Sequence, residues 1–219
     1  MIDFDDIAEQ LKSIPTLIKN GHGGIEAQMR MAPEERRKDV ERYMQSGKNA
    51  RLGAVLILLF PFHGNVYISL IKRPTYIGVH SGQIAFPGGK AENSDKNLLH
   101  TALREAFEEV NIIPDLVKGA TELTPIYIPP SNFLVTPYVA FSREIPDFKA
   151  DPREVEEILF LPIKELWKEE NIKMGDFYSN LYLVKNYPYF DFSIGQVWGA
   201  SAMMLAELRQ LLNPNKITL

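Results

Sequence analysis

The chain has 219 residues, and its 45% hydrophobic and 24% charged residues are typical of a soluble globular protein. Its formal net charge of −4 argues against broad electrostatic binding of nucleic acid or of an anionic membrane. The chain contains no cysteine, which excludes disulfides, thiolate metal sites and a cysteine nucleophile.

A chain of this length suits one large domain, or one domain with an appendage. We expect residues 1–48 to form an N-terminal helical extension and residues 49–219 to form the main domain. The N-terminus lacks the basic and apolar pattern of a signal peptide, and the longest apolar run, residues 54–61, is too short to span a bilayer. A cytoplasmic location is therefore expected.

Two helices are expected in the extension. The first is predicted by apolar residues at helical spacing and is expected to be divided at Pro15. Glycines within residues 21–24 break the chain. The second helix is expected to start at Pro33, because proline is favoured in a first helical turn, and to end near Gly47. The apolar residues of the first helix are Ile7, Leu11, Ile14 and Ile18.

From residue 51 the pattern changes to strands. Residues 54–60 form a continuous apolar run that predicts a buried strand, and residues 66–71 return as the second strand of a hairpin. A loop then leads to the Pro-Gly-Gly sequence of residues 87–89. Further elements are expected in this order: strands at 123–128, 134–141 and 155–161, a short helix at 163–169, a closing hairpin within 176–192, and a final helix at 199–212.

Residues 97–110 contain no glycine or proline and predict a helix with an apolar stripe. On this helix Glu105, Glu108 and Glu109 stand at positions i, i+3 and i+4, so their carboxylates project from one side. Hard divalent cations prefer clustered carboxylate oxygens, and a diphosphate substrate supplies further oxygen ligands. A solvated helix face without metal is the alternative that the helix alone leaves open.

The residues around this helix resemble the Nudix box. That pattern is Gly, five residues, Glu, seven residues, Arg-Glu, an aliphatic residue, any residue, Glu-Glu, any residue, Gly and an aliphatic residue. Gly89 and residues 104–112 match it with three departures. Asp95 replaces the first Glu, eight residues separate it from Arg104, and Asn111 replaces the closing Gly. Asparagine is the next-best residue for the left-handed conformation that ends a helix.

The resemblance implies an α/β fold, an α/β/α sandwich around a mixed β-sheet, and strands on both sides of one glutamate-bearing helix also fit this fold. It implies Mg²⁺ or Mn²⁺ held by Glu105, Glu108, Glu109 and the Gly89 carbonyl. Glu105 is then the base that activates water, and Arg104 orients the glutamates. Such an enzyme splits a diphosphate by positioning and charge neutralisation, with no protein nucleophile.

Some members of this family use a further carboxylate from a later loop. Residues 151–157 lie just before a predicted strand and carry several acidic side chains. Glu154, six residues before Phe160, is the favoured catalytic candidate. The alternative is that the charged residues of this segment only lead into the strand and have no catalytic role.

A longer pattern resembles the coenzyme A diphosphatase branch of the family. It comprises Arg73 and the sequence Gly-Gln-Ile-Ala-Phe-Pro-Gly-Gly at residues 82–89, with further matches at residues 133–137 and 197–199. The branch has Ser or Ala in place of Pro74 and a second Arg in place of Gly78. The resemblance implies substrate-binding roles for Lys72, Arg73, Gly82, Phe86 and Gly88.

We therefore expect metal-dependent hydrolysis of coenzyme A or acyl-coenzyme A to 3′,5′-ADP and (acyl-)4′-phosphopantetheine. One alternative is the same chemistry on another nucleoside diphosphate derivative, such as ADP-ribose or a dinucleotide. Another is a non-catalytic Nudix-like module that binds a metabolite and regulates a partner. The expected partner is a small molecule, with no nucleic acid and no membrane, and the extension together with the habits of the family favours a homodimer.

Overall fold

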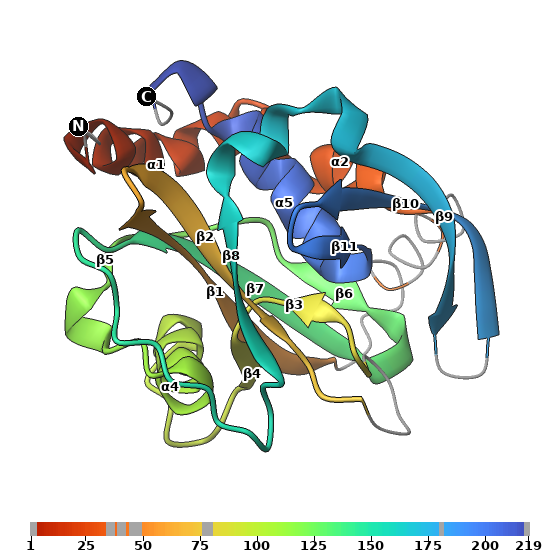
Figure 1. Cartoon of the computed structure of the whole chain (residues 1–219), viewed down its shortest axis with the longest axis horizontal. Helices are drawn as coiled ribbons and strands as arrows, with labels where there is room; N and C mark the ends of the chain where they lie inside the picture. Colours follow the sequence, from red (N-terminus) through yellow and green to blue (C-terminus); the bar gives the residue numbers. More distant parts are fainter. Residues whose placement is uncertain are drawn as a thin grey trace.

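The computed structural model describes residues 4–33, 38, 43, 50–75, 81–179 and 182–216 (Figure 1). Over these residues a mixed sheet of eight strands lies between helices, and a smaller antiparallel sheet of three strands lies next to α5. The expected α/β/α sandwich is confirmed.

The large sheet is organised around β1 (Arg51–Phe62). β7 (Phe133–Phe141) runs parallel to β1, whereas β2 (Asn65–Lys72) and β4 (Gly88–Lys90) pair with it in antiparallel fashion. Residues 56–60 are fully buried. A strand that is covered on both faces has a continuous apolar sequence, which explains the apolar run of β1. The other strands are β3 (Ile84–Ala85), β5 (Lys118–Glu122), β6 (Ile126–Ile128), β8 (Glu157–Pro162), β9 (Ile172–Ser179), β10 (Tyr182–Phe192) and β11 (Gly195–Val197).

Helices cover the two faces of this sheet. α4 (Leu98–Val110) packs on one face through buried residues such as Ala102 and Ala106. α1 (Phe4–Lys19) and α5 (Gly199–Leu211) join the larger apolar core on the other face (Figure 1). The short helical turns are α2 (Gly24–Gln28), η1 (Met29–Met31), η2 (Pro114–Leu116), η3 (Pro129–Ser131), η4 (Ile163–Trp167), η5 (Glu169–Asn171) and η6 (Pro214–Lys216).

The limits of α4 agree with the sequence. The Asn97 side chain caps its start by accepting a hydrogen bond from the backbone N–H of His100 at 2.8 Å. Asn111 ends it in the left-handed conformation expected of that residue, with φ 59° and ψ 31°. The Asn111 amide also donates to the Asp147 carbonyl at 2.7 Å. The helix predicted at residues 97–110 is confirmed.

The other predicted elements differ from the structure mainly at the sheet edge and in the short helices. The closing hairpin is β9–β10 and the final helix is α5, as expected. Of the strand predicted at residues 123–128, only β6 forms, and residues 118–122 form the edge strand β5. The sequence did not reveal β5 because it lacks apolar alternation. The helix expected at residues 163–169 is two separate 3₁₀ turns, η4 and η5.

The expectation that Pro15 divides the first helix is wrong, because α1 is continuous through it. A proline inside a helix loses one hydrogen bond and costs about 3 kcal/mol. Leu11 and Ile14 are fully buried on the sheet-facing side of α1, and each large apolar side chain contributes about 1.5–3 kcal/mol on burial. Packing therefore offsets the cost of the proline and keeps the helix in one piece.

The second helix predicted in the extension lies mostly outside the described residues. Within residues 34–47 the structure describes Lys38 and Tyr43, and both are helical. Before them, α2 and η1 form a short helical pair that the sequence did not predict, because a five-residue helix offers too little periodicity to detect.

The extension shares its core with the main domain. The ring of Phe4 in α1 lies 5.9 Å from that of Phe141 in β7, and Met29 and Met31 of η1 are buried in the same apolar cluster. The boundary proposed at residue 48 stays a prediction. The first strand, β1, begins at Arg51.

Glu207 of α5 joins the extension to the rest of the molecule. Its side chain is fully buried and accepts hydrogen bonds from the backbone N–H of Gly24 at 3.0 Å, the amide of Gln28 at 2.8 Å and the hydroxyl of Thr124 at 2.6 Å. These donors belong to two separate segments of the chain, since Gly24 and Gln28 both lie in α2 and Thr124 precedes β6. One carboxyl group therefore connects α2, α5 and the chain entering β6.

We predict that Glu207→Ala lowers the free energy of unfolding by about 2–5 kcal/mol, because it leaves several buried donors without an acceptor. The midpoint of urea denaturation measures the loss. Glu170→Ala is the matched control, because Glu170 is exposed, and it is expected to change stability by less than about 0.5 kcal/mol. Equal effects of the two substitutions contradict the role assigned to Glu207.

Candidate active site

Two consecutive glycines in β4 allow α4 to approach the sheet closely. The N–H of Gly88 donates to Glu109 Oε2 at 2.8 Å, and a Cβ on Gly88 would lie 2.3 Å from the carbonyl oxygen of Ala54. A Cβ on Gly89 would lie 2.6 Å from the carboxylate carbon of Glu105. Neither position has room for a side chain, so the glycines set how near the α4 glutamates come to the sheet.

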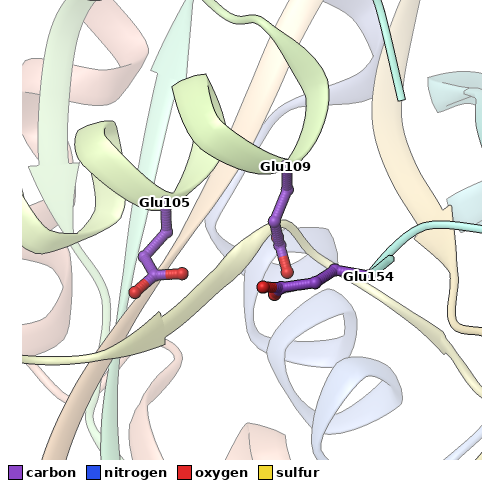
Figure 2. A group of neighbouring side chains, drawn as sticks. All are labelled: Glu105, Glu109 and Glu154. Carbon is purple, nitrogen blue, oxygen red and sulfur yellow. The ribbon is translucent and has the colours of Figure 1, made fainter. Parts of the chain in front are cut away.

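Three carboxylates gather beside these glycines. Figure 2 shows Glu105 and Glu109 extending from α4 and Glu154 extending toward them from another segment. Each of the three offers an oxygen, and these oxygens all lie within 4.8 Å of one another. Oxygen ligands at this spacing suit a hard divalent cation such as Mg²⁺ or Mn²⁺.

Glu154 reaches the group because its loop docks on the C-terminal end of α4. The N–H of Asp151 donates to the Glu109 carbonyl at 2.9 Å, and the N–H of Lys149 donates to the Val110 carbonyl at 3.2 Å. The N–H of Glu154 in turn donates to the Asp151 carbonyl at 3.0 Å. The last carbonyls of a helix lack partners within the helix, and here the loop supplies them.

The surroundings of Glu109 disfavour an unneutralised negative charge. Glu109 is 2% exposed, and burial raises its pKa to about 8 despite the opposing charge of Arg73, whose Nη2 lies 3.8 Å from Oε1. Burial also raises the pKa of Glu105. Among the described residues, Glu109 Oε1 has no hydrogen-bond partner. A cation at this place would supply the missing partner, so the three carboxylates fit a divalent metal.

Arg104 is held rigidly behind the carboxylates. Asp95 accepts from its Nε and Nη2 at 3.1 Å each, and the Lys90 carbonyl accepts from Nη2 at 3.1 Å. The same guanidinium donates to Glu105 Oε1 at 2.8 Å. Arg104 also holds the pKa of the buried Asp95 carboxyl well below its usual range. Arg104 thus orients Glu105, and Asp95, to which the sequence assigned no role, orients Arg104.

Glu108 lies apart from the other carboxylates. It is 56% exposed by its side chain, and its Oε2 accepts from Arg104 Nη1 at 3.0 Å. The expectation that all three α4 glutamates project together therefore describes only two of them in this structure, Glu105 and Glu109. The i+3 position turns Glu108 toward the solvent side of the helix, so its metal-binding role stays a prediction.

A cavity of about 690 Å³ adjoins the carboxylates. Its lining includes Glu105, Glu154 and the predicted substrate-binding residues Arg73, Phe86 and Gly88, together with Gly89. The remaining lining is mostly apolar, and much of it comes from the chain around β6 and the start of α5. It includes Ile128, Pro129, Pro130, Phe133, Val135, Trp198, Ala200 and Met204.

The other two predicted substrate-binding residues, Lys72 and Gly82, lie at a second hollow of about 390 Å³. Gln83 and Trp198 line both hollows, so the two adjoin. Lys72 donates to Glu156 at 2.6 Å, so its ammonium group is paired with a carboxylate in this structure. The sequence analysis did not identify Gln83 or Lys90 as lining residues. Each directly follows a glycine of the motif, and this position was the signal that could have identified them.

The sequence matches the family model described as NUDIX domain over residues 50–181. It is 33% identical over 177 residues to Nudix hydrolase 15, mitochondrial, of Arabidopsis thaliana, covering 77% of this chain and 59% of that protein. It is 28% identical over 181 residues to mitochondrial coenzyme A diphosphatase NUDT8 of Homo sapiens, covering 79% and 77%. The crystal structure of RenU, a Nudix hydrolase from M. smegmatis, matches the fold with TM-score 0.51 and 17% identity, covering 78% and 89%.

The chain spans only part of some of these relatives, 59% of Nudix hydrolase 15 and 52% of Nudix hydrolase 22, chloroplastic, both of Arabidopsis thaliana. Within the described residues, no helix combines the length and apolar character needed to cross a membrane. The cytoplasmic location expected from the sequence stays a prediction.

We predict that the metal-free protein loses stability, relative to Glu109→Gln, as the pH rises from about 5 to about 8. The pKa of Glu109 in the folded protein, about 8, lies above the ordinary glutamate value of 4.5, so the folded protein holds this proton more tightly than the unfolded chain. Its contribution to stability is therefore present at low pH and disappears as the pH rises through this window.

Urea denaturation in EDTA at the two pH values measures the effect. The pH-dependent loss is expected to exceed that of Glu109→Gln by at least about 1 kcal/mol, because one pKa unit corresponds to about 1.4 kcal/mol. The variant carries no titrating group at this position. Identical pH dependence in the two proteins rules out a raised pKa for Glu109.

Proposed function

Because the chain belongs to the NUDIX family, we propose that it is a metal-dependent diphosphatase that hydrolyses a nucleoside diphosphate derivative with Mg²⁺ or Mn²⁺. The supporting observation is the group formed by Glu105, Glu109 and Glu154 beside the two glycines, with oxygens within 4.8 Å of one another. The unpartnered Oε1 of the buried Glu109 adds to it.

Glu105, Glu109, Glu154 and the Gly89 carbonyl are the groups that would hold the metal. When bound, a divalent cation there neutralises charge on the diphosphate and makes water more acidic. Glu108 is retained as a proposed ligand, although its carboxylate accepts from Arg104 in this structure.

The residues of the chain account for the proton and for orientation. Glu105 is proposed to take the proton of the attacking water, because its partly buried carboxylate has a raised pKa and faces the cavity. Arg104 fixes that carboxylate through the 2.8 Å hydrogen bond. Arg73 lines the cavity and is 27% exposed by its side chain, so its guanidinium is available to an anionic substrate.

We further propose coenzyme A or acyl-coenzyme A as the substrate. Water adds across the phosphoanhydride and yields 3′,5′-ADP and (acyl-)4′-phosphopantetheine. Support comes from the motif around Arg73 and residues 82–89 and from the similarity to the human mitochondrial coenzyme A diphosphatase NUDT8. ADP-ribose or a dinucleotide is the alternative substrate, and a non-catalytic regulatory module is the alternative from another class. A homodimer is also proposed, and light scattering at several concentrations tests it.

We predict that the protein with Mg²⁺ or Mn²⁺ converts coenzyme A to the two products above, identified by mass. ADP-ribose and a dinucleoside polyphosphate are assayed in parallel, and EDTA is expected to abolish every reaction because no protein nucleophile replaces the metal. If ADP-ribose is cleaved and coenzyme A remains intact, the assignment of coenzyme A as the substrate is wrong and ADP-ribose takes its place. Inactivity on all of them favours the regulatory module.

We predict that the glutamates differ in importance according to their position. Glu105→Gln is expected to lower kcat by about 100-fold or more, because it removes the proposed base and a metal ligand. Glu109→Gln and Glu154→Gln are expected to weaken metal dependence, measured as a higher metal concentration for half-maximal rate. Glu108→Gln is the comparison on the same helix and is expected to be the mildest. If Glu108→Gln weakens metal dependence more than Glu109→Gln does, the metal site formed by Glu105, Glu109 and Glu154 is contradicted.

A further inference from the structure

The cavity has a wall that comes from the N-terminal extension. Pro33 lines it, as does Ile128 of β6. The ring of Tyr43 stacks on that of Tyr127, with centroids 4.0 Å apart and planes 11° from parallel. Neighbouring residues of a strand point to opposite faces, so Tyr43 packs on the face of β6 that points away from Ile128 and the cavity.

The position of Pro33 is fixed by the chain before it. Met31 is 2% exposed, and Gln28 donates to the buried Glu207 of α5 at 2.8 Å. The same helix carries Met204, which lines the cavity. α5 therefore both anchors the extension and lines the cavity. The position of Pro33 in the cavity wall consequently depends on how the extension packs on α5.

This wall belongs to the apolar side of the cavity. The carboxylates Glu105 and Glu109 come from α4 on one face of the sheet, whereas Met204 comes from α5 on the other face (Figure 1). A diphosphate is expected at the carboxylates, where a cation can neutralise it. The part of the substrate beyond the diphosphate then meets Pro33, Met204 and the apolar chain around β6.

We propose that the extension selects the substrate by length: Pro33 lines the cavity, Tyr43 supports β6 from the side away from the cavity by stacking on Tyr127, and together they limit the aliphatic group that a nucleoside diphosphate derivative can carry into this cavity. The proposal rests on the proposed function for the location of the diphosphate. An apolar wall excludes a group that is too long by steric overlap and favours a shorter one by burying its methylenes. Loss of the stack removes the support on one side of β6 and relaxes this limit.

The test compares coenzyme A thioesters from acetyl through octanoyl to palmitoyl. Tyr43→Ala is expected to raise the ratio of kcat/KM for palmitoyl to that for acetyl by about tenfold, the scale on which a hydrophobic pocket discriminates chain length. Tyr43→Phe keeps the ring and is expected to keep the wild-type ratio. Tyr178→Ala is the matched tyrosine control, because Tyr178 is 74% exposed on β9 and lines neither hollow. An unchanged ratio in Tyr43→Ala, or an equal loss on every thioester, overturns the proposal.

A binding measurement separates this proposal from the proposed function. S-alkyl pantetheines of the same lengths, which carry no diphosphate, are titrated calorimetrically in EDTA. The wild type is expected to bind with a limit in chain length, and Tyr43→Ala is expected to shift that limit to longer chains. If no thioester is hydrolysed, the substrate assignment fails. The titration alone then tests whether the extension limits chain length. Absence of binding at every length, or the same limit in both proteins, overturns the proposal that the extension limits chain length.

Discussion

The close approach of α4 to the two glycines of β4 is the constraint on which the site depends. Gly89 lies so near the Glu105 carboxylate that a Cβ would stand 2.6 Å from it, and Gly88 donates its N–H to Glu109. A side chain at either position would move the helix away from the sheet or displace its carboxylates. The three carboxylates can therefore gather beside the cavity because these two positions of β4 carry no side chains.

Bringing carboxylates together under partial burial raises their free energy, and the structure compensates only part of this cost. Asp95 fixes Arg104, and Arg104 neutralises one side of Glu105. Glu109 receives the Gly88 N–H and a more distant Arg73, yet its pKa remains raised to about 8. The remaining imbalance is the physical reason to expect a cation, because a metal supplies charge that the described side chains do not.

Local patterns were sufficient for the elements that carry the site. The continuous apolar run of residues 54–60 indicated a buried strand, and helical periodicity with Asn111 at the end defined α4. The motif around Gly89 and Arg104 identified residues that meet where α4 approaches β4. These features depend on contacts within a few residues, where spacing along the chain translates directly into geometry.

Tertiary structure decided which of these residues meet. Glu154 joins Glu105 and Glu109 through a loop docked on the end of α4, and Glu108, four residues from Arg104, pairs with it instead. Packing kept α1 continuous through Pro15, and Glu207 anchored the extension beside the cavity. The sequence by itself determined α4, the buried strand β1 and the pair of glycines beside them. Contacts between segments far apart in the chain follow from the order of strands in the sheet, which local periodicity does not encode.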